Sequence, residues 1–129
     1  MSKGEFLGTN DTLTEKIIGC FLEVHKSLGP GFTEKTYVNA LKVVFSNCGF
    51  SAEYEKQFNV YFQEKLVGYF KADIVVGDKV IIEVKAIDTK IPLVFERQVV
   101  SYLKSSGKKV GLLVNFGCSS CEFRRIIAK

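Results

Sequence analysis

The chain has 129 residues, of which 47% are hydrophobic and 25% charged, which predicts a single domain with enough apolar material for one packed core. No apolar run approaches the roughly 18–20 residues of a membrane-spanning helix, and the first residues lack the apolar region of a secretory signal. We therefore expect no membrane association and a cytoplasmic location. The net charge of +4 is compatible with a polyanionic partner but does not require one.

Two amphipathic helices are predicted in the first part of the chain. Residues 12–28 carry apolar side chains at helical spacing, and residues 1–11 before them are expected to form a flexible N-terminus. Gly29-Pro30-Gly31 ends the first helix because proline cannot continue one. A second helix follows over about 33–48, and Tyr37 is expected to be a core residue that fixes it.

The rest of the chain alternates between strand and helix patterns. In chain order these are three strands, a helix and two strands, over 53–63, 66–76, 79–87, 92–106, 109–115 and 122–128. The fifth of these elements is almost entirely apolar, which is typical of a strand buried on both faces. The order α-α-β-β-β-α-β-β predicts an α/β fold in which a mixed central sheet is flanked by helices.

Charged residues interrupt two of the hydrophobic strands. Glu83 and Lys85 share one face of their strand, Ile82 and Val84 share the other, and Asp73 lies in the strand before. An exposed surface strand or a structural salt bridge would each explain this pattern. The apolar strand expected beside it favours an interior position instead. Charges held there are costly unless they are paired or bind a metal.

The turn between these two strands decides whether the carboxylates meet. A two-residue turn at Gly77-Asp78 would pair Asp73 with Ile82 and leave the two acids on opposite faces. A three-residue loop over 77–79 would set Asp73 directly across from Glu83. We predict the three-residue loop, or a bulge with the same effect.

Asp73, a hairpin and then Glu83-x-Lys85 resemble the signature of the PD-(D/E)XK nuclease superfamily. The segment 31–37, Gly-Phe-Thr-Glu-Lys-Thr-Tyr, matches the motif that names the GxxExxY proteins, a small family assigned to that superfamily. Ala72 stands where the superfamily's name has proline, a position that varies among its members. The resemblance extends from residue 13 onward through Val24-His25-Lys26, Leu28–Gly31, Gln98-x-x-x-Tyr102-Leu103-Lys104 and Gly111–Gly117.

This resemblance implies a restriction-endonuclease-like fold and hydrolysis of phosphodiester bonds in DNA or RNA, dependent on Mg²⁺ or Mn²⁺. Three carboxylates in one pocket repel one another, a divalent cation removes that repulsion, and ligands that are all oxygens favour Mg²⁺ or Mn²⁺ over zinc. The family's roles carry over to Glu34, Asp73 and Glu83 as metal ligands, to Lys85 as the lysine that activates water and offsets charge, and to Gln98 and Tyr102, which contact substrate or water.

Four cysteines and one histidine leave a second kind of site open. Cys118 and Cys121 have zinc or redox spacing, and Cys20, Cys48 or His25 would have to complete a zinc site. Two reduced thiols near a turn are the simpler interpretation, and we assign no role to His25.

Basic residues gather in the last quarter of the chain, either as a phosphate-facing patch or as a solvated face. They are Lys104, Lys108, Lys109, Arg124, Arg125 and Lys129.

The leading hypothesis is therefore a metal-dependent nuclease. The alternative is a nuclease-fold module without turnover that binds nucleic acid or a protein partner, and a purely structural domain ranks last. Because a domain this small has little room for separate recognition elements, we expect any sequence specificity to come from a homodimer or a protein partner.

Overall fold

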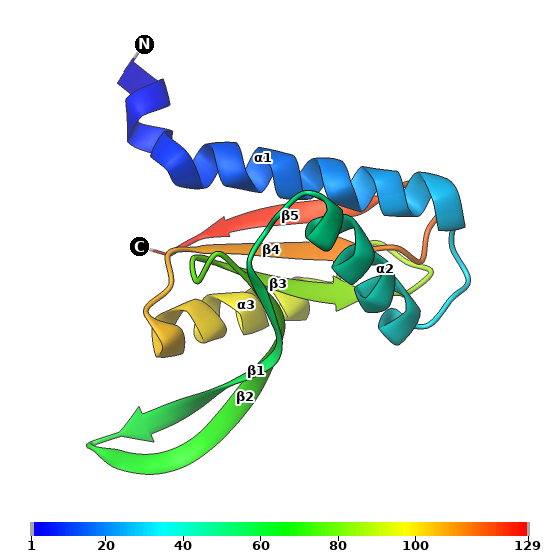
Figure 1. The fold of residues 1–129 in the computed structure, drawn as a ribbon. Helices are drawn as coiled ribbons and strands as arrows, with labels where there is room; N and C mark the ends of the chain where they lie inside the picture. Colours follow the sequence, from blue (N-terminus) through cyan, green and yellow to red (C-terminus); the bar gives the residue numbers. More distant parts are fainter. Residues whose placement is uncertain (1, 129) are drawn as a thin grey trace.

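The computed structural model describes the backbone of residues 2–128 and the side chains of residues 12–128. Its elements follow the predicted order (Figure 1). They are α1 (Ser2–Leu28), α2 (Glu34–Asn47), β1 (Ala52–Phe62), β2 (Lys65–Val76), β3 (Val80–Lys85), α3 (Leu93–Ser106), β4 (Val110–Asn115) and β5 (Glu122–Ile127). No helix in the described residues is both long and apolar enough to cross a bilayer.

The strands form one mixed sheet in the order β1-β2-β3-β4-β5. β3 and β4 pair in parallel and the other neighbours pair antiparallel, so β4 is the predicted parallel neighbour of β3 and β5 is an edge strand. Helices α1 and α2 lie on one face and α3 on the other (Figure 1). The structure thus confirms the predicted fold class.

Each face of the sheet has its own core. On the α1/α2 side, Ile82 and Val84 of β3 pack with residues of both helices, whereas Ile81 packs on the α3 side with Val99 and Leu103. β3 is therefore interior on both faces, and a polar residue on it must find partners within the protein. The exposed-strand interpretation of its charges is wrong.

Helix α1 begins at Ser2, earlier than the predicted residue 12. Residues 2–11 contain no proline, so the backbone hydrogen-bond ladder can continue through them. The flexibility expected of residues 1–11 stays a prediction, and the side chains of these residues lie outside the described part of the chain.

The turn between α1 and α2 is held by Tyr37. Its fully buried side chain stacks on Phe116 at 4.6 Å between ring centroids. Its hydroxyl donates to the Gly29 carbonyl at 2.5 Å and accepts from the Phe32 N–H at 3.2 Å. Tyr37 is therefore the core residue that was predicted to fix α2, whose first residue is Glu34.

Replacing Tyr37 by phenylalanine keeps the ring but removes both hydroxyl contacts. We expect the free energy of unfolding to fall by about 1–3 kcal/mol, because the Gly29 carbonyl loses its donor. Urea unfolding measures this change, and Tyr69→Phe is the control, since that tyrosine is 64% exposed. Equal midpoints for the two variants would contradict the assignment.

Candidate functional site

The hairpin between β2 and β3 has the predicted three-residue loop, 77–79. Val76 pairs with Val80, and the Lys79 N–H donates to the Val76 carbonyl at 3.1 Å. Continued along both strands, this register sets Asp73 opposite Glu83. The condition for bringing the two carboxylates together is therefore met.

At this position in the sheet, the carboxylates of Asp73 and Glu83 accept hydrogen bonds from N–H groups of the neighbouring strand. Glu83 Oε2 accepts a hydrogen bond from the Asp73 N–H at 3.0 Å, and Asp73 Oδ2 accepts one from the Val84 N–H at 2.8 Å. Both acidic groups thus lie in the seam between β2 and β3, each fixed by the strand opposite. Such reciprocal contacts hold the two groups in one arrangement before any ligand binds.

The strands separate here because the alternation of β2 breaks at Asp73. Ala72 packs in the α3-side core, yet Ile74, two residues on, packs in the α1/α2-side core. The irregularity has a counterpart in β1, where Glu55 has φ of 54°, in the left-handed region that non-glycine residues rarely adopt. Strained residues of this kind cluster at functional sites.

A pocket of about 190 Å³ opens beside this irregularity, between the start of α2 and strands β1 and β2. Its lining residues are Glu34, Lys35, Val38, Glu55 and Asp73. Glu55 was not foreseen as a site residue, because its exposed position on β1 looks in sequence like that of Glu53. Only its backbone conformation and its place across from Asp73 identify Glu55 as a site residue.

Burial, together with repulsion between neighbouring acidic groups, raises the pKa of Asp73 and of Glu83. Burial, and then the charge of Asp73, raise the pKa of Glu83 to about 8. Burial likewise raises the pKa of Asp73; the Val84 N–H opposes this, and the charge of Glu34 adds to it. The cluster therefore favours binding a proton or a cation.

Lys85 lies beside the carboxylates without pairing with them. The residue is half-buried, and its Nζ is 4.2 Å from the centroid of the Phe95 ring, a cation–π contact. Its charge lowers the pKa of both Asp73 and Glu83, but within residues 12–128 it forms no ion pair. The structural salt-bridge interpretation is therefore wrong, and the lysine is available to a ligand.

The two predicted residues of α3 differ in their surroundings. Tyr102 is half-buried and stacks on Phe70 with 3.9 Å between ring centroids. Burial and the charges of Glu83 and Asp73 raise its pKa, so its hydroxyl interacts electrostatically with both carboxylates. Gln98 is exposed, and no hydrogen bond within the described residues joins it to the carboxylates. A role for Gln98 remains a prediction.

The donor chemistry of this site suits a hard divalent cation, since its acidic groups offer only oxygen atoms. Asp73 and Glu83 each use one oxygen on a backbone N–H, which leaves the other oxygen free of such a bond. In the described part of the chain, however, no three His, Cys, Asp or Glu side chains already enclose a metal-sized space. Glu34 as a third ligand therefore remains a prediction.

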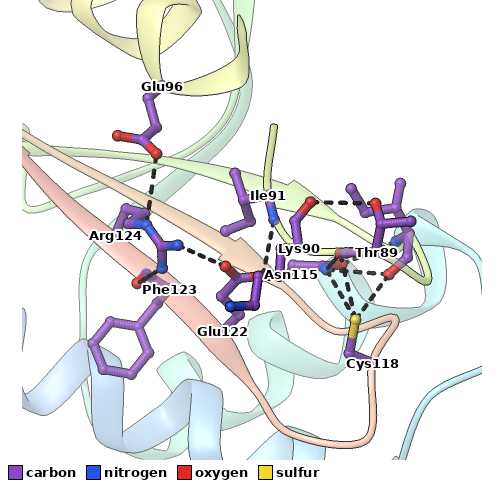
Figure 2. A network of polar contacts seen from close by, with 10 residues as sticks. Thr89, Lys90, Ile91, Glu96, Asn115, Cys118, Glu122, Phe123 and Arg124 are labelled. Atoms are coloured by element: carbon purple, nitrogen blue, oxygen red, sulfur yellow. Dashed lines mark hydrogen bonds and ion pairs between the residues drawn. The ribbon is translucent and has the colours of Figure 1, made fainter. Parts of the chain in front are cut away.

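Asn115 fixes the segment that leaves β3 after Lys85, its register partner (Figure 2). Its side chain is fully buried, and its Oδ1 accepts from the N–H groups of Ile87 and Gly117 at 2.9 and 3.0 Å. Its Nδ2 donates to the carbonyls of Ile87 and Thr89 at 3.1 and 3.0 Å. An asparagine that ends a continuous apolar strand was a visible signal for such a role.

Glu122 of β5 holds the other end of the same segment (Figure 2). Its Oε1 accepts from the Ile91 N–H at 3.0 Å, and its Oε2 accepts from Arg124 at 2.7 Å. Arg124 also reaches Glu96 of α3, at 3.6 Å. These contacts tie β5 to the start of α3, the helix that presents Phe95 and Tyr102.

The cysteine and histidine residues serve structure in this part of the chain. Cys118 Sγ donates to the Thr89 carbonyl at 3.4 Å, and His25 Nε2 donates to the Cys118 carbonyl at 2.8 Å. Burial raises the pKa of Cys121 to about 11, which disfavours the thiolate that binds zinc. With no metal-holding group among the described residues, the zinc interpretation has no support.

The basic cluster near the C-terminus is partly neutralised. Lys108 pairs with Asp78 at 2.8 Å, and Arg124 pairs with Glu122 and Glu96. Lys129 lies outside the described residues. The ion pairs of Lys108 and Arg124 therefore argue against a phosphate-facing patch that includes these two residues.

A mixed sheet with helices on both faces, carrying opposed acidic residues and a lysine on adjacent central strands, defines a nuclease-type α/β domain. The family model of the PD-(D/E)XK nuclease superfamily matches residues 11–126, and the chain belongs to that superfamily.

Among solved structures the chain is similar to the crystal structure of SSO0001, with a TM-score of 0.58 and 22% sequence identity. The match covers 73% of this chain and 49% of that one, so this chain spans about half the length of SSO0001. This likeness shows the shared fold. A search of curated proteins finds no significant match.

Proposed function

We propose that the chain is a divalent-metal-dependent nuclease that hydrolyses phosphodiester bonds of DNA or RNA. The observation that carries this proposal is the seam in which Asp73 and Glu83 face each other, with Lys85 unpaired beside them. A purely structural cluster would be expected to neutralise its charges with a nearby cation. Here no ion pair within the described residues neutralises Asp73 or Glu83, and burial, followed by the charge of Asp73, raises the pKa of Glu83.

Asp73 and Glu83 would hold the cation, Mg²⁺ or Mn²⁺, with Glu34 or Glu55 from the wall of the adjoining pocket. When bound, the cation supplies Lewis acidity and offsets the negative charge of the scissile phosphate. Lys85 donates from Nζ to the oxygens on which charge grows during water attack, and the Tyr102 hydroxyl donates to a neighbouring phosphate oxygen. The Asn115 contacts keep the end of β3 in place during the reaction.

We further propose that the chain belongs to the GxxExxY branch of the superfamily. The motif 31–37 supports this assignment, and so does a physical reason for its spacing. Its tyrosine, Tyr37, binds the glycine-containing turn before it, and its glutamate, Glu34, begins α2 at the wall of the pocket.

Cleavage of mixed DNA and RNA substrates with Mg²⁺ or Mn²⁺ tests the proposal. We expect Asp73→Asn and Lys85→Ala each to lower the cleavage rate by at least about 10²-fold, because each removes charge from the reacting centre. Glu53→Gln is the matched control, an exposed carboxylate on β1 that pairs with Lys56 outside the pocket. Equal cleavage by all four proteins would identify a contaminant and reject the enzyme.

A different result would favour the alternative function. If no variant and no metal gives cleavage, but the wild type binds nucleic acid in a salt-dependent manner, the chain is a binding module that kept the fold without turnover.

A further inference from the structure

Strands β1 and β2 extend beyond the rest of the sheet as a two-stranded arm, residues 56–71, that projects from the body (Figure 1). One face of the arm is covered, because Phe58 and Phe70 stack on each other and Phe70 stacks on Tyr102 of α3. The arm is therefore braced against the helix next to the candidate site. Its position is fixed by packing at its base.

The opposite face, which we call the outer face, is exposed along its whole length. It consists of Gln57, Asn59, Tyr61, Tyr69 and Lys71. Gln57 contacts Asn59 at 3.3 Å and Asn59 contacts the Tyr61 hydroxyl at 3.5 Å, so these three side chains share one side. Tyr69 and Lys71 pair across the strands with Asn59 and Gln57, which places them on that same side.

Exposed aromatic side chains are the unusual feature of this face. Tyr61 and Tyr69 are 62% and 64% exposed, and at the tip Phe62 and Leu66 are 64% and 61% exposed. Apolar surface gathered in this way marks an interaction site more often than an inert surface. Between residues 57 and 71 the charged residues are Lys65, Lys71 and Glu64, and neither lysine forms an ion pair within the described residues.

The outer face is continuous with the candidate site. Two residues beyond Lys71 along β2 is Asp73, and two residues before Gln57 along β1 is Glu55, and both carboxylates line the pocket beside α2. Two residues of strand cover roughly 7 Å, so a ligand lying along the arm would pass directly into the pocket.

We propose that the outer face of the arm binds an unpaired nucleic-acid strand and leads it to the Asp73–Glu83 seam. This inference rests on the proposed nuclease function and adds the form of its substrate. Tyr61 and Tyr69 provide rings on which bases stack, Lys71 contacts a phosphate, and the amides of Gln57 and Asn59 bond to base or sugar edges. The bases of a duplex are stacked on one another and would not reach these rings.

A polyanion suits this face better than a second copy of the chain. Lysine is depleted at the centre of protein–protein interfaces, whereas here Lys71, which forms no ion pair within the described residues, accompanies the aromatic rings. Stacking rings together with unpaired cations are the combination found where single strands bind without sequence preference.

Binding is best measured in the Asp73→Asn background with EDTA present, so that cleavage cannot occur. The probe is a fluorescent 12-nucleotide single strand of mixed sequence, as DNA and as RNA, compared with its duplex. We expect Tyr61→Ala and Tyr69→Ala each to raise Kd for the single strand by about tenfold, and Tyr61→Phe and Tyr69→Phe to leave it unchanged. Lys71→Ala should reduce the salt dependence by about one phosphate contact.

The control is Val43→Ala, since Val43 is 61% exposed but lies on α2, away from the arm. Unchanged single-strand binding in the Tyr→Ala variants would overturn the inference, as would a preference for duplex that these variants do not alter. A wild-type dimer that Tyr61→Ala converts to a monomer, with nucleic-acid binding intact, would make the arm a self-association surface instead. Binding and cleavage are measured separately. Arm-dependent binding without any cleavage would therefore reject the proposed nuclease function but support the arm as a binding surface for single strands.

Discussion

Replacing Glu83 by glutamine is expected to abolish cleavage while making the metal-free protein more stable than the wild type above about pH 6. These opposite effects follow from one property of the site. In the wild type the Glu83 carboxyl group is buried, faces Asp73 and has its pKa raised to about 8. Glutamine keeps an oxygen that can accept the Asp73 N–H, but it carries no charge.

The sign of the pH effect follows from this raised pKa. An unfolded glutamate has a pKa of 4.5. Between this value and about 8, the folded protein holds a proton at Glu83 that the unfolded protein has released. The free energy of unfolding of the metal-free wild type therefore falls as the pH rises through this range, by as much as about 4 kcal/mol. The raised pKa of Asp73 acts in the same direction.

Urea unfolding from pH 5 to 8.5 in EDTA measures this difference. The wild-type midpoint should decline with pH and that of Glu83→Gln should be nearly flat, while Glu53→Gln keeps the wild-type profile. Adding Mn²⁺ at pH 8 should raise the wild-type melting temperature and leave Glu83→Gln unchanged, because bound cation stabilises only the folded state. Parallel pH profiles for the wild type and Glu83→Gln would show that the pKa of Glu83 is not raised in the folded protein.

Replacing Asn115 by leucine is expected to destabilise the protein by at least about 4 kcal/mol and to lower cleavage by about 10²-fold. Leucine is close to asparagine in size but offers no polar atoms. The N–H groups of Ile87 and Gly117 and the carbonyls of Ile87 and Thr89 would lose their partner in a buried place. The segment after Lys85 would then have to move, and the lysine with it.

Asn115→Asp provides a test if the leucine variant does not fold. Aspartate keeps the oxygen that accepts from Ile87 and Gly117 but loses the donor to the Thr89 carbonyl. Unfolding midpoints and cleavage rates are compared with those of Asn39→Leu, an exposed asparagine on α2. Wild-type cleavage by a folded Asn115 variant would show that the hydrogen bonds of Asn115 are not needed to position Lys85.

Local patterns in the sequence were enough to predict the order of the helices and strands and the position of Asp73 opposite Glu83. Periodicity in apolar residues placed the helices and strands, because burial on one face requires it. The choice between a two-residue turn and a loop over 77–79 decided which side chains could meet, and the loop found is the one that brings Asp73 and Glu83 together. Both conclusions depend on residues close together along the chain.

Contacts between distant segments could be known only from the tertiary structure. Glu55 joins the site because β1 and β2 are both irregular beside Asp73, and nothing near Glu55 in sequence distinguishes it from Glu53. Tyr102 and Gln98 lie one turn apart on α3, yet only Tyr102 packs on Phe70, where the carboxylate charges help raise its pKa. The residue types and their spacing along the chain identify the groups that can carry the chemistry. Which of them share one pocket, and with what pKa, was decided by packing, since burial and neighbouring charge arise only when the chain folds.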